Sequence, residues 1–193
     1  MTGVQTCALP ICGNLAITDA TGHSIAVPAL TFRDHVEGGD LDAILAMNEA
    51  DVRHLSGLTA ASLERLAKRA SYLRIAQLDG RDVGFLLVLP AEASYASENF
   101  QWFKRRYSRF LYVDRVVVAP HARREGIASR LYRDLEVYAR ASGASVIACE
   151  INVRPVNPES LAFHDRHGFV EVGTQDTERG TKTVSMRIKP LAG

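Results

Sequence analysis

The sequence predicts an α/β fold in which helices pack on a central, mostly antiparallel sheet of about six to seven strands flanked by about four helices. Two observations lead to this prediction. Short apolar or alternating segments, typical of strands, are interspersed with segments in which apolar residues recur at helical spacing. Two of the strand segments are separated by Asp79-Gly80, a pair that favours the tight turn of an antiparallel hairpin.

The composition is that of an ordinary globular protein. Of the 193 residues, 47% are hydrophobic and 23% are charged, and the net charge is +1. The charge therefore gives no reason to expect nucleic acid or an anionic membrane as a partner. The most apolar run, Phe85–Leu89, has the length of a strand and not of a membrane span. Three scattered cysteines form neither a disulfide framework nor a zinc site, so we expect a reducing, cytoplasmic location.

The first residues do not look native. Residues 1–11 resemble the translation of a sequencing-library adapter along their whole length, and no basic region precedes an apolar core as a secretory signal would require. We therefore expect residues 1–12 to be a non-native, disordered leader. Residues 13–29 form an N-terminal extension without a clear prediction, and a single domain of residues 30–193 follows.

The first half of the domain is predicted to contain two helices between strands. Asp40 and Thr59 can each cap a helix, because each precedes a segment of helical spacing. Residues 90–109 are irregular and suggest a short helix or a loop beside the substrate. The expected elements are an extended segment at 15–18, a strand at 30–36, helices after Asp40 and Thr59, and hairpin strands at 72–78 and 83–89.

The second half is predicted to alternate strands with two further helices. Gly143 and Gly168 each end a helix, because glycine favours the left-handed conformation that follows a helix. Asn157 and Pro158 start the second of these helices, as a capping side chain and a proline in the first turn. The expected elements are strands at 111–118, 146–153, 169–173 and 183–188, and helices at 124–141 and from 157 to Gly168.

The stretch from Val116 to Ala128 is the most informative part of the sequence. An apolar strand runs into a short turn that opens directly into a helix, whose first N–H groups have no partner within it. Together with the helix dipole, these groups can bind a pyrophosphate. Gly126 leaves the backbone accessible to phosphate oxygens, and Arg123 and Arg124 add positive charge. A plain strand-to-helix turn with solvated arginines is the alternative.

Two segments together resemble the GNAT N-acetyltransferase superfamily, and the resemblance covers about residues 30–190. Arg123–Ala128 fits the family's Arg/Gln-x-x-Gly-x-Gly/Ala signature, and an apolar strand precedes it in the expected place. Asn157–Phe169 resembles the second block of the family, an asparagine followed by a helix with aromatic residues and a Gly-Phe pair. Within the superfamily, the chain is similar to a bacterial branch of predicted acetyltransferases.

The resemblance implies a GNAT-like sheet and acetyl-CoA, or a related acyl-CoA, as co-substrate. The pyrophosphate would be bound by backbone N–H groups, and the arm of the coenzyme would lie between the two central strands, which separate near Val118 and Asn152. His164 and His167 lack a third ligand, so no metal is expected. The resemblance assigns these residues to the coenzyme: Val116, Val118, Arg123, Arg124, Glu125, Gly126, Ile127, Ala128, Ser129, Asn152, Asn157 and Ser160.

Acyl transfer to an amine requires a base, because an amine with a pKa of about 10.4 is almost fully protonated at pH 7. Asp114 and Glu150 are the candidates, since each lies on a predicted central strand; either could instead form a structural ion pair. The strand period places Asp114 on the same face as Val116 and Val118, unless a β-bulge changes the face. His164 stands where many family members have a tyrosine that protonates the leaving thiolate. The imidazole of His164 can protonate the thiolate in its place, or it can simply fill space between the helix and the sheet.

The sequence thus predicts a cytoplasmic N-acetyltransferase that moves an acetyl group to a small-molecule or peptide amine by direct transfer in a ternary complex. Cys149, in an apolar strand, is expected to be an inert core residue. The aromatic and basic cluster 102–109 is a substrate lid, a contact for the 3′-phosphate of the coenzyme, or a solvated helix face. The alternatives are a non-catalytic acyl-CoA-binding regulatory module and a structural interaction protein. No nucleic acid or membrane partner is expected, and the fold allows a homodimer.

Overall fold

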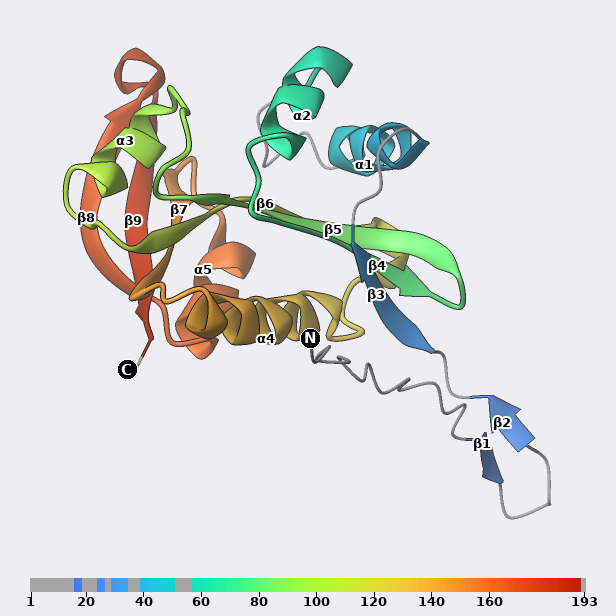
Figure 1. Ribbon diagram of the computed structural model, residues 1–193. Coiled ribbons are helices and arrows are strands. Elements are labelled where there is room, and N and C mark those ends of the chain that lie inside the picture. Colours follow the sequence, from blue (N-terminus) through green and yellow to red (C-terminus); the bar gives the residue numbers. More distant parts are fainter. Residues whose placement is uncertain (1–15, 19–23, 27–28, 35–38, 51–56, 192–193) are drawn as a thin grey trace, which may run out of the picture.

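A seven-stranded sheet forms the centre of the protein (Figure 1). The computed structural model describes residues 16–18, 24–26, 29–34, 39–50 and 57–191. The strand order is β3-β4-β5-β6-β7-β9-β8, and all neighbours are antiparallel except β6 and β7. The predicted mixed, mostly antiparallel fold is therefore confirmed. The strands are β3 (Leu30–Asp34), β4 (Tyr72–Leu78), β5 (Arg81–Pro90), β6 (Phe110–Val118), β7 (Val146–Arg154), β8 (Val170–Thr177) and β9 (Lys182–Pro190), and β1 (Ala16–Thr18) and β2 (Ser24–Ala26) form a separate hairpin.

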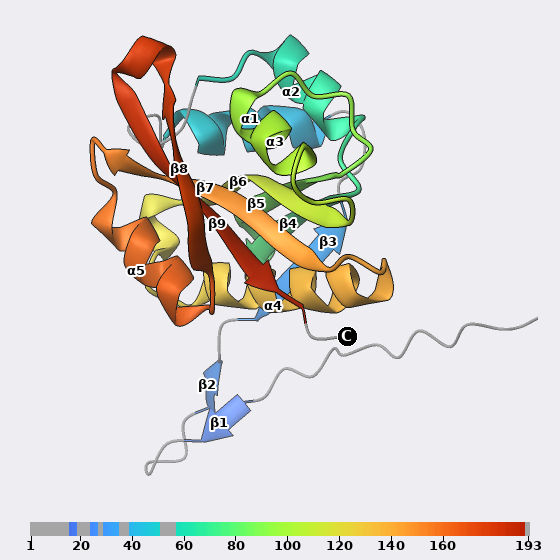
Figure 2. The same ribbon diagram turned by 90° about the vertical axis from the view of Figure 1, so that its left-hand side faces the viewer.

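Five α-helices of the described chain cover both faces of this sheet (Figures 1 and 2). The helices α1 (Gly39–Glu49), α2 (Ala60–Ala67) and α3 (Glu98–Lys104) pack on one face, and α4 (Ile127–Ala141) and α5 (Pro158–Arg166) pack on the other. Short 3-10 helices lie at η1 (Pro120–Ala122) and η2 (Glu178–Gly180). None of the helices in these ranges is long and apolar enough to cross a membrane.

The apolar run in β5 is explained by burial on both sides. Phe85 and Leu87 belong to the core under α1, α2 and α3, whereas Leu86 and Val88 belong to the core over α4. All four side chains are fully buried. Because successive side chains of a strand point to opposite faces, a strand covered on both faces needs apolar residues at every position.

Several local signals set the element boundaries as predicted. Thr59 caps α2, and its side chain and that of Ser62 form a reciprocal capping box. Asp79 and Gly80 both have positive φ, as the tight turn between β4 and β5 requires. Asn157 caps α5, and a proline occupies the first turn of that helix.

Two predicted helix starts are wrong. The helix α1 begins at Gly39, so Asp40 lies in its first turn and does not cap it. The helix α4 begins at Ile127 and not at Arg124. Arg124 and Gly126 have φ values of 69° and 73°, which a right-handed helix cannot contain.

The remaining differences concern length and placement. The strands β8 and β9 extend beyond their predicted ends, because the polar residues 174–177 continue the ladder with residues 182–185. The irregular stretch 90–109 contains the short helix α3. The predicted leader, residues 1–12, lies outside the described residues. Of the predicted extension, residues 13–29, only β1, β2 and residue 29 are described.

The burial of β5 leads to a prediction for stability. Leu87→Ala should lower the free energy of unfolding by about 2–5 kcal/mol, because it removes fully buried methyl groups and leaves a cavity. Val137→Ala is the control, since Val137 is 70% exposed and should change stability by less than about 0.5 kcal/mol. Urea denaturation followed by circular dichroism measures both values. Equal effects of the two substitutions would contradict the described core.

Candidate active site

The candidate active site lies where β6 and β7 separate. Each strand has nine residues, but they pair only through Phe110–Tyr112 and Val146–Ala148. The described residues show no further pairing between the two strands. A cavity of about 510 Å³ lies beyond this point and is lined by Val116 and Val118 from β6 and by Asn152 from β7. The gap expected between the central strands is therefore present, and the strands already diverge before Val118 and Asn152.

The turn between β6 and α4 exposes a run of backbone N–H groups. Gly126 is the N-cap residue of α4, and its carbonyl accepts a hydrogen bond of 3.0 Å from the N–H of Arg130. Within the described chain, the N–H groups of residues 124–129 have no backbone acceptor. These donors and the dipole of α4 favour a bound anion. A Cβ on Gly126 would meet no atom within 4 Å, so its positive φ, rather than crowding, favours glycine there.

A second cavity, of about 740 Å³, lies against this turn. Val118, Arg123 and Ala128 line both cavities, which are therefore adjacent. The Nε of Arg123 donates to the carbonyl of Val118 at 3.2 Å and holds the guanidinium at the junction. Glu125 lines neither cavity. The other residues assigned to the coenzyme by resemblance line at least one of them: Val116, Val118, Arg123, Arg124, Gly126, Ile127, Ala128, Ser129, Asn152, Asn157 and Ser160.

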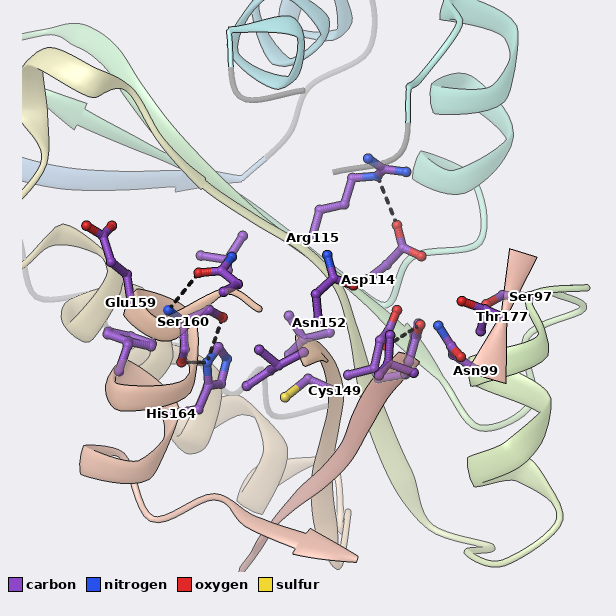
Figure 3. Close-up of a pocket in the computed structure, with 18 of the residues that line it drawn as sticks. Ser97, Asn99, Asp114, Arg115, Cys149, Asn152, Glu159, Ser160, His164 and Thr177 are labelled. Carbon is purple, nitrogen blue, oxygen red and sulfur yellow. Dashed lines mark hydrogen bonds and ion pairs between the residues drawn. The ribbon is translucent and has the colours of Figure 1, made fainter. Parts of the chain in front are cut away.

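The start of α5 forms the opposite wall of the first cavity (Figure 3). The N–H of Asn157 donates to the carbonyl of Asn152 at 3.0 Å. The side-chain oxygen of Asn157 accepts from the N–H of Ser160 at 3.1 Å. These bonds bring three of the predicted residues together at the end of β7.

Asp114 occupies a β-bulge in the middle of β6. Leu87 of β5 pairs with Arg115 and Val88 pairs with Val113, so Asp114 has no residue opposite it. An extra residue of this kind changes the face to which the following side chains point. Bulges are frequent beside active sites for this reason.

Because of the bulge, the prediction that Asp114 shares a face with Val116 and Val118 is wrong. The valines pack with the core over α4. The Asp114 carboxylate instead lies 3.1 Å from the Nε of Arg115 (Figure 3), and Arg115 donates to Asn48 of α1 at 2.9 Å. Burial raises the pKa of Asp114, and the Arg115 guanidinium opposes that shift. Asp114 therefore forms the structural ion pair that the sequence allowed.

Glu150 lies on β7 and lines the same cavity. The hydroxyl of Tyr112 donates to its Oε2 at 2.7 Å, and Asn99 lines the same cavity. Burial, together with the negative charge of Asp114, raises the pKa of Glu150 to about 7, and the hydrogen bond from Tyr112 opposes the rise. A carboxylate with this pKa can accept a proton near neutral pH.

His164 lies in α5 and is only 4% exposed. Its Nδ1 is 2.8 Å from the carbonyl oxygen of Ser160. Because a carbonyl only accepts, the proton of the neutral ring lies on Nδ1, and Nε2 accepts from the Tyr132 hydroxyl at 2.8 Å. Burial lowers the pKa of His164 to about 4. At neutral pH the ring is uncharged and both nitrogens are occupied, which disfavours the expected role of proton donor.

Cys149 and the aromatic residues near position 102 belong to the core. Cys149 is buried, and burial raises the pKa of its thiol, which favours an inert residue over a nucleophile. Trp102 and Phe103 belong to the core on the face of the sheet that α1, α2 and α3 cover, and Arg106 stacks on the Trp102 ring at 3.7 Å from its centre. No residue of the cluster 102–109 lines either cavity. Lys104, Arg105, Arg106 and Arg109 are exposed at and beyond the end of α3, which favours a solvated basic surface over a lid.

Three residues at the site were not identified from the sequence: Asn99, Tyr112 and Tyr132. The strand period could have indicated Tyr112, which stands two residues before Asp114. No local pattern points to Asn99, because α3 reaches the cavity only through tertiary packing. Tyr132 lies beside the predicted apolar stripe of α4 and is fully buried.

The site fits the coenzyme that the resemblance implies. Unpaired N–H groups and two arginines, Arg123 and Arg124, suit a pyrophosphate. The narrow gap beside the unpaired edge of β6 suits an extended chain that can bond to backbone groups. Within the described ranges, no group of three or more His, Cys, Asp or Glu side chains is placed to hold a metal ion.

Comparison with known proteins gives a family and a fold. The family described as Acetyltransferase (GNAT) family matches residues 44–169, and proteins of curated function gave no match. Ard1 from Thermoplasma volcanium superposes with a TM-score of 0.68 at 16% identity, over 86% of this chain and 99% of that one. The ribosomal-protein-S18-alanine N-acetyltransferase from Escherichia coli gives 0.63 at 15% identity, over 86% and 96%. The NatC complex bound to Gag peptide and CoA gives 0.65 at 13% identity, over 84% and 99%.

At these identities the solved structures establish the fold alone. The family match spans well over half of the chain and includes the turn at Gly126, the gap between β6 and β7, and both candidate carboxylates. The chain therefore belongs to the GNAT acetyltransferase family.

Proposed function

We propose that the protein transfers an acetyl group from acetyl-CoA to the amine of a small molecule or peptide, by direct attack within a ternary complex. The observation that carries the proposal is the position of Glu150. This partly buried residue lines a cavity that adjoins the turn with free N–H groups. When bound, acetyl-CoA supplies the acetyl thioester.

The turn before α4 holds the coenzyme in this proposal. The N–H groups of residues 124–129 bind the pyrophosphate, and Arg123 and Arg124 add charge. Beyond Tyr112, the edge of β6 that faces β7 has no strand partner, so its N–H and C=O groups before the Val118 carbonyl, which accepts from Arg123, are available to the coenzyme arm. Asn157 closes the gap from the side of α5.

Glu150 acts as the base. The acceptor amine arrives protonated and must lose a proton before its nitrogen can attack a carbonyl carbon. Ionised Glu150 accepts that proton, while the Tyr112 hydroxyl fixes the carboxylate. The amine nitrogen then bonds to the acetyl carbonyl carbon, the carbon–sulfur bond breaks, and CoA leaves as a thiolate that takes up a proton from solvent. Asp114 is held by Arg115, so its charge contributes by raising the pKa of Glu150.

His164 acts as a positioning residue and not as an acid. Its Nε2 accepts the hydroxyl proton of Tyr132, which fixes that ring between α4 and α5. The ring of Tyr132 packs edge-on against Phe163, with centres 5.3 Å apart. Both aromatic residues line the cavity and shape its wall.

The acceptor enters from the end of the cavity formed by α3 and the β8–β9 hairpin. Ser97, Asn99 and Thr177 lie at this end, away from Ser160 and His164 (Figure 3). Two of the similar structures carry names that refer to a protein or peptide, ribosomal protein S18 and Gag peptide. They support an amine of this general class as the acceptor.

The two carboxylates can be separated by mutation. Glu150→Gln should lower kcat about 100-fold or more, because the base is lost, without weakening acetyl-CoA binding. In the unmodified protein, kcat/KM should rise as the pH increases through about 7, because only ionised Glu150 accepts a proton. Asp114→Asn removes a negative charge that raises this pKa, so the rise should move to lower pH. Thiol release with a panel of amines measures both effects.

Two outcomes would contradict these roles. Loss of activity in Asp114→Asn with retention in Glu150→Gln would assign the base to Asp114. Acetyl-CoA binding without acetylation of any amine, and unaffected by the carboxylate substitutions, would favour the non-catalytic acyl-CoA-binding module.

The role of the turn before α4 can be tested with a matched control at the other end of that helix. Gly126→Val should weaken acetyl-CoA binding roughly 10-fold to 100-fold, because valine at a φ of 73° costs about 1–3 kcal/mol unless the turn rearranges. Gly143→Val introduces the same residue at a φ of 75° beyond the other end of α4, where neither cavity extends. Isothermal titration calorimetry compares the two variants. Equal losses of affinity would show that binding does not depend on the turn.

A further inference from the structure

His167 contacts the start of α4 from the end of α5. It is the C-cap residue of α5, and its Nε2 lies 3.0 Å from the hydroxyl oxygen of Ser129. Its ring packs against that of Phe163, with centres 4.4 Å apart. His167 lines neither cavity, whereas Ser129 lines the cavity against the turn before α4. His167 can therefore act on a ligand in that cavity through the hydroxyl of Ser129.

The hydrogen bond between the two side chains can have either of two directions. A bare Nε2 accepts the hydroxyl proton of Ser129, whereas an Nε2 that carries a proton donates to the hydroxyl oxygen. In the first arrangement the proton of Ser129 points to His167. In the second it is free for another acceptor, and ionised phosphate oxygens can only accept. A diphosphate in this cavity therefore favours the form of His167 that carries a proton on Nε2.

The other ring nitrogen of His167 is able to hold a proton at the same time. Within the part of the chain that the structure describes, its Nδ1 has no hydrogen-bond partner. His164 differs, because it is buried and both of its nitrogens are engaged, by Ser160 and Tyr132. His167 is only half-buried. Of these two histidines, His167 is therefore the one that can become an imidazolium.

Positive charges around His167 disfavour its protonation. Burial lowers the pKa of His167 below its usual value and Lys189 lowers it further, while Glu136 opposes the shift. Lys189 is itself bonded to Glu136. A diphosphate adds negative charge next to Ser129, and an opposite charge nearby favours the imidazolium. The charged and titratable groups around the ring are Tyr132, Arg133 and Glu136 of α4, His164 and Arg166 of α5, and Lys189 of β9.

We propose that His167 couples the binding of the coenzyme to the uptake of a proton. In its protonated form His167 donates from Nε2 to Ser129, and the hydroxyl of Ser129 donates in turn to the diphosphate. His167 is thus a positioning residue, because it acts through Ser129. The inference rests on the part of the proposed function in which the turn before α4 binds acetyl-CoA, and not on the acetyl transfer.

The first test is an NMR titration of the histidine rings in the full chain, with and without saturating CoA. The signal of His167 is assigned by its loss in His167→Gln, and the ¹⁵N shifts report which ring nitrogen carries a proton. CoA should raise the pKa of His167 by about one unit and keep a proton on Nε2. In Ser129→Ala the rise should be smaller, because the hydroxyl between the ring and the ligand is lost. An unchanged His167 titration in the unmodified protein would overturn the inference.

The second test is the pH dependence of CoA binding, measured by isothermal titration calorimetry. Because the pKa of His167 rises on binding, affinity is highest at low pH and falls as the pH increases through the pKa of the complex. The fall between about pH 5 and about pH 8 should be roughly 10-fold greater in the unmodified protein than in His167→Gln. Glutamine can still donate to Ser129 but takes up no proton. The titration of CoA itself is the same in both and cancels.

His121→Gln is the matched control. His121 is an exposed residue of η1, between β6 and α4, and lines neither cavity. The variant should keep the pH dependence of the unmodified protein. An equal change in His121→Gln and His167→Gln, or no change in His167→Gln, would overturn the inference.

The remaining outcomes separate the inference from the proposed function. Proton uptake on CoA binding in a protein that acetylates no amine would support the inference and count against the acetyl transfer alone. A protein that does not bind CoA would contradict both. Thermal unfolding checks that each variant is folded. If His167→Gln is not, Ser129→Ala still decides the question, because a pH dependence of CoA binding equal to that of the unmodified protein overturns the role of Ser129.

Discussion

The site depends on one constraint, the early end of the pairing between β6 and β7. The outer edge of each strand is satisfied along its length, by β5 on one side and by β9 on the other. Their facing edges share only three pairs and then diverge. Buried backbone N–H and C=O groups need partners, so a diverging pair of strands inside a sheet is a natural place for a ligand with its own amide groups. The helix that connects the two strands begins at the same end of the sheet, which adds the anion-binding turn.

The two candidate carboxylates have different surroundings. The bulge in β6 turns Asp114 towards Arg115, and the pair is anchored to α1 through Asn48. The Arg115 guanidinium opposes the rise that burial causes in the pKa of Asp114. Glu150 accepts a hydrogen bond from the neutral hydroxyl of Tyr112, and its pKa is raised to about 7 by burial and by the charge of Asp114.

The fold and the coenzyme side of the site could largely be predicted from the sequence, because they depend on local signals. Strand and helix periods, the Asp79-Gly80 turn and the caps at Thr59 and Asn157 all act within a few residues. The face of Asp114 could not be predicted, since the bulge is defined only by pairing with β5. The environment of His164 also depends on a tertiary contact, the hydroxyl of Tyr132 from another helix. The position of Asn99 at the site could not be predicted for the same reason.

The short seam between β6 and β7 also has a mechanical consequence. The gap divides the sheet into one group of strands, β3 to β6, and another, β7 to β9. Three residue pairs between β6 and β7 join the two groups, and α4 contacts β4, β5 and β6 of the first group and β7 of the second. Such a sheet bends most easily along the seam, because few bonds resist rotation there. A narrow ligand that bonds to the facing edges of both strands completes the hydrogen bonding of the sheet. The sheet is therefore stiffer when the ligand is bound than when it is absent.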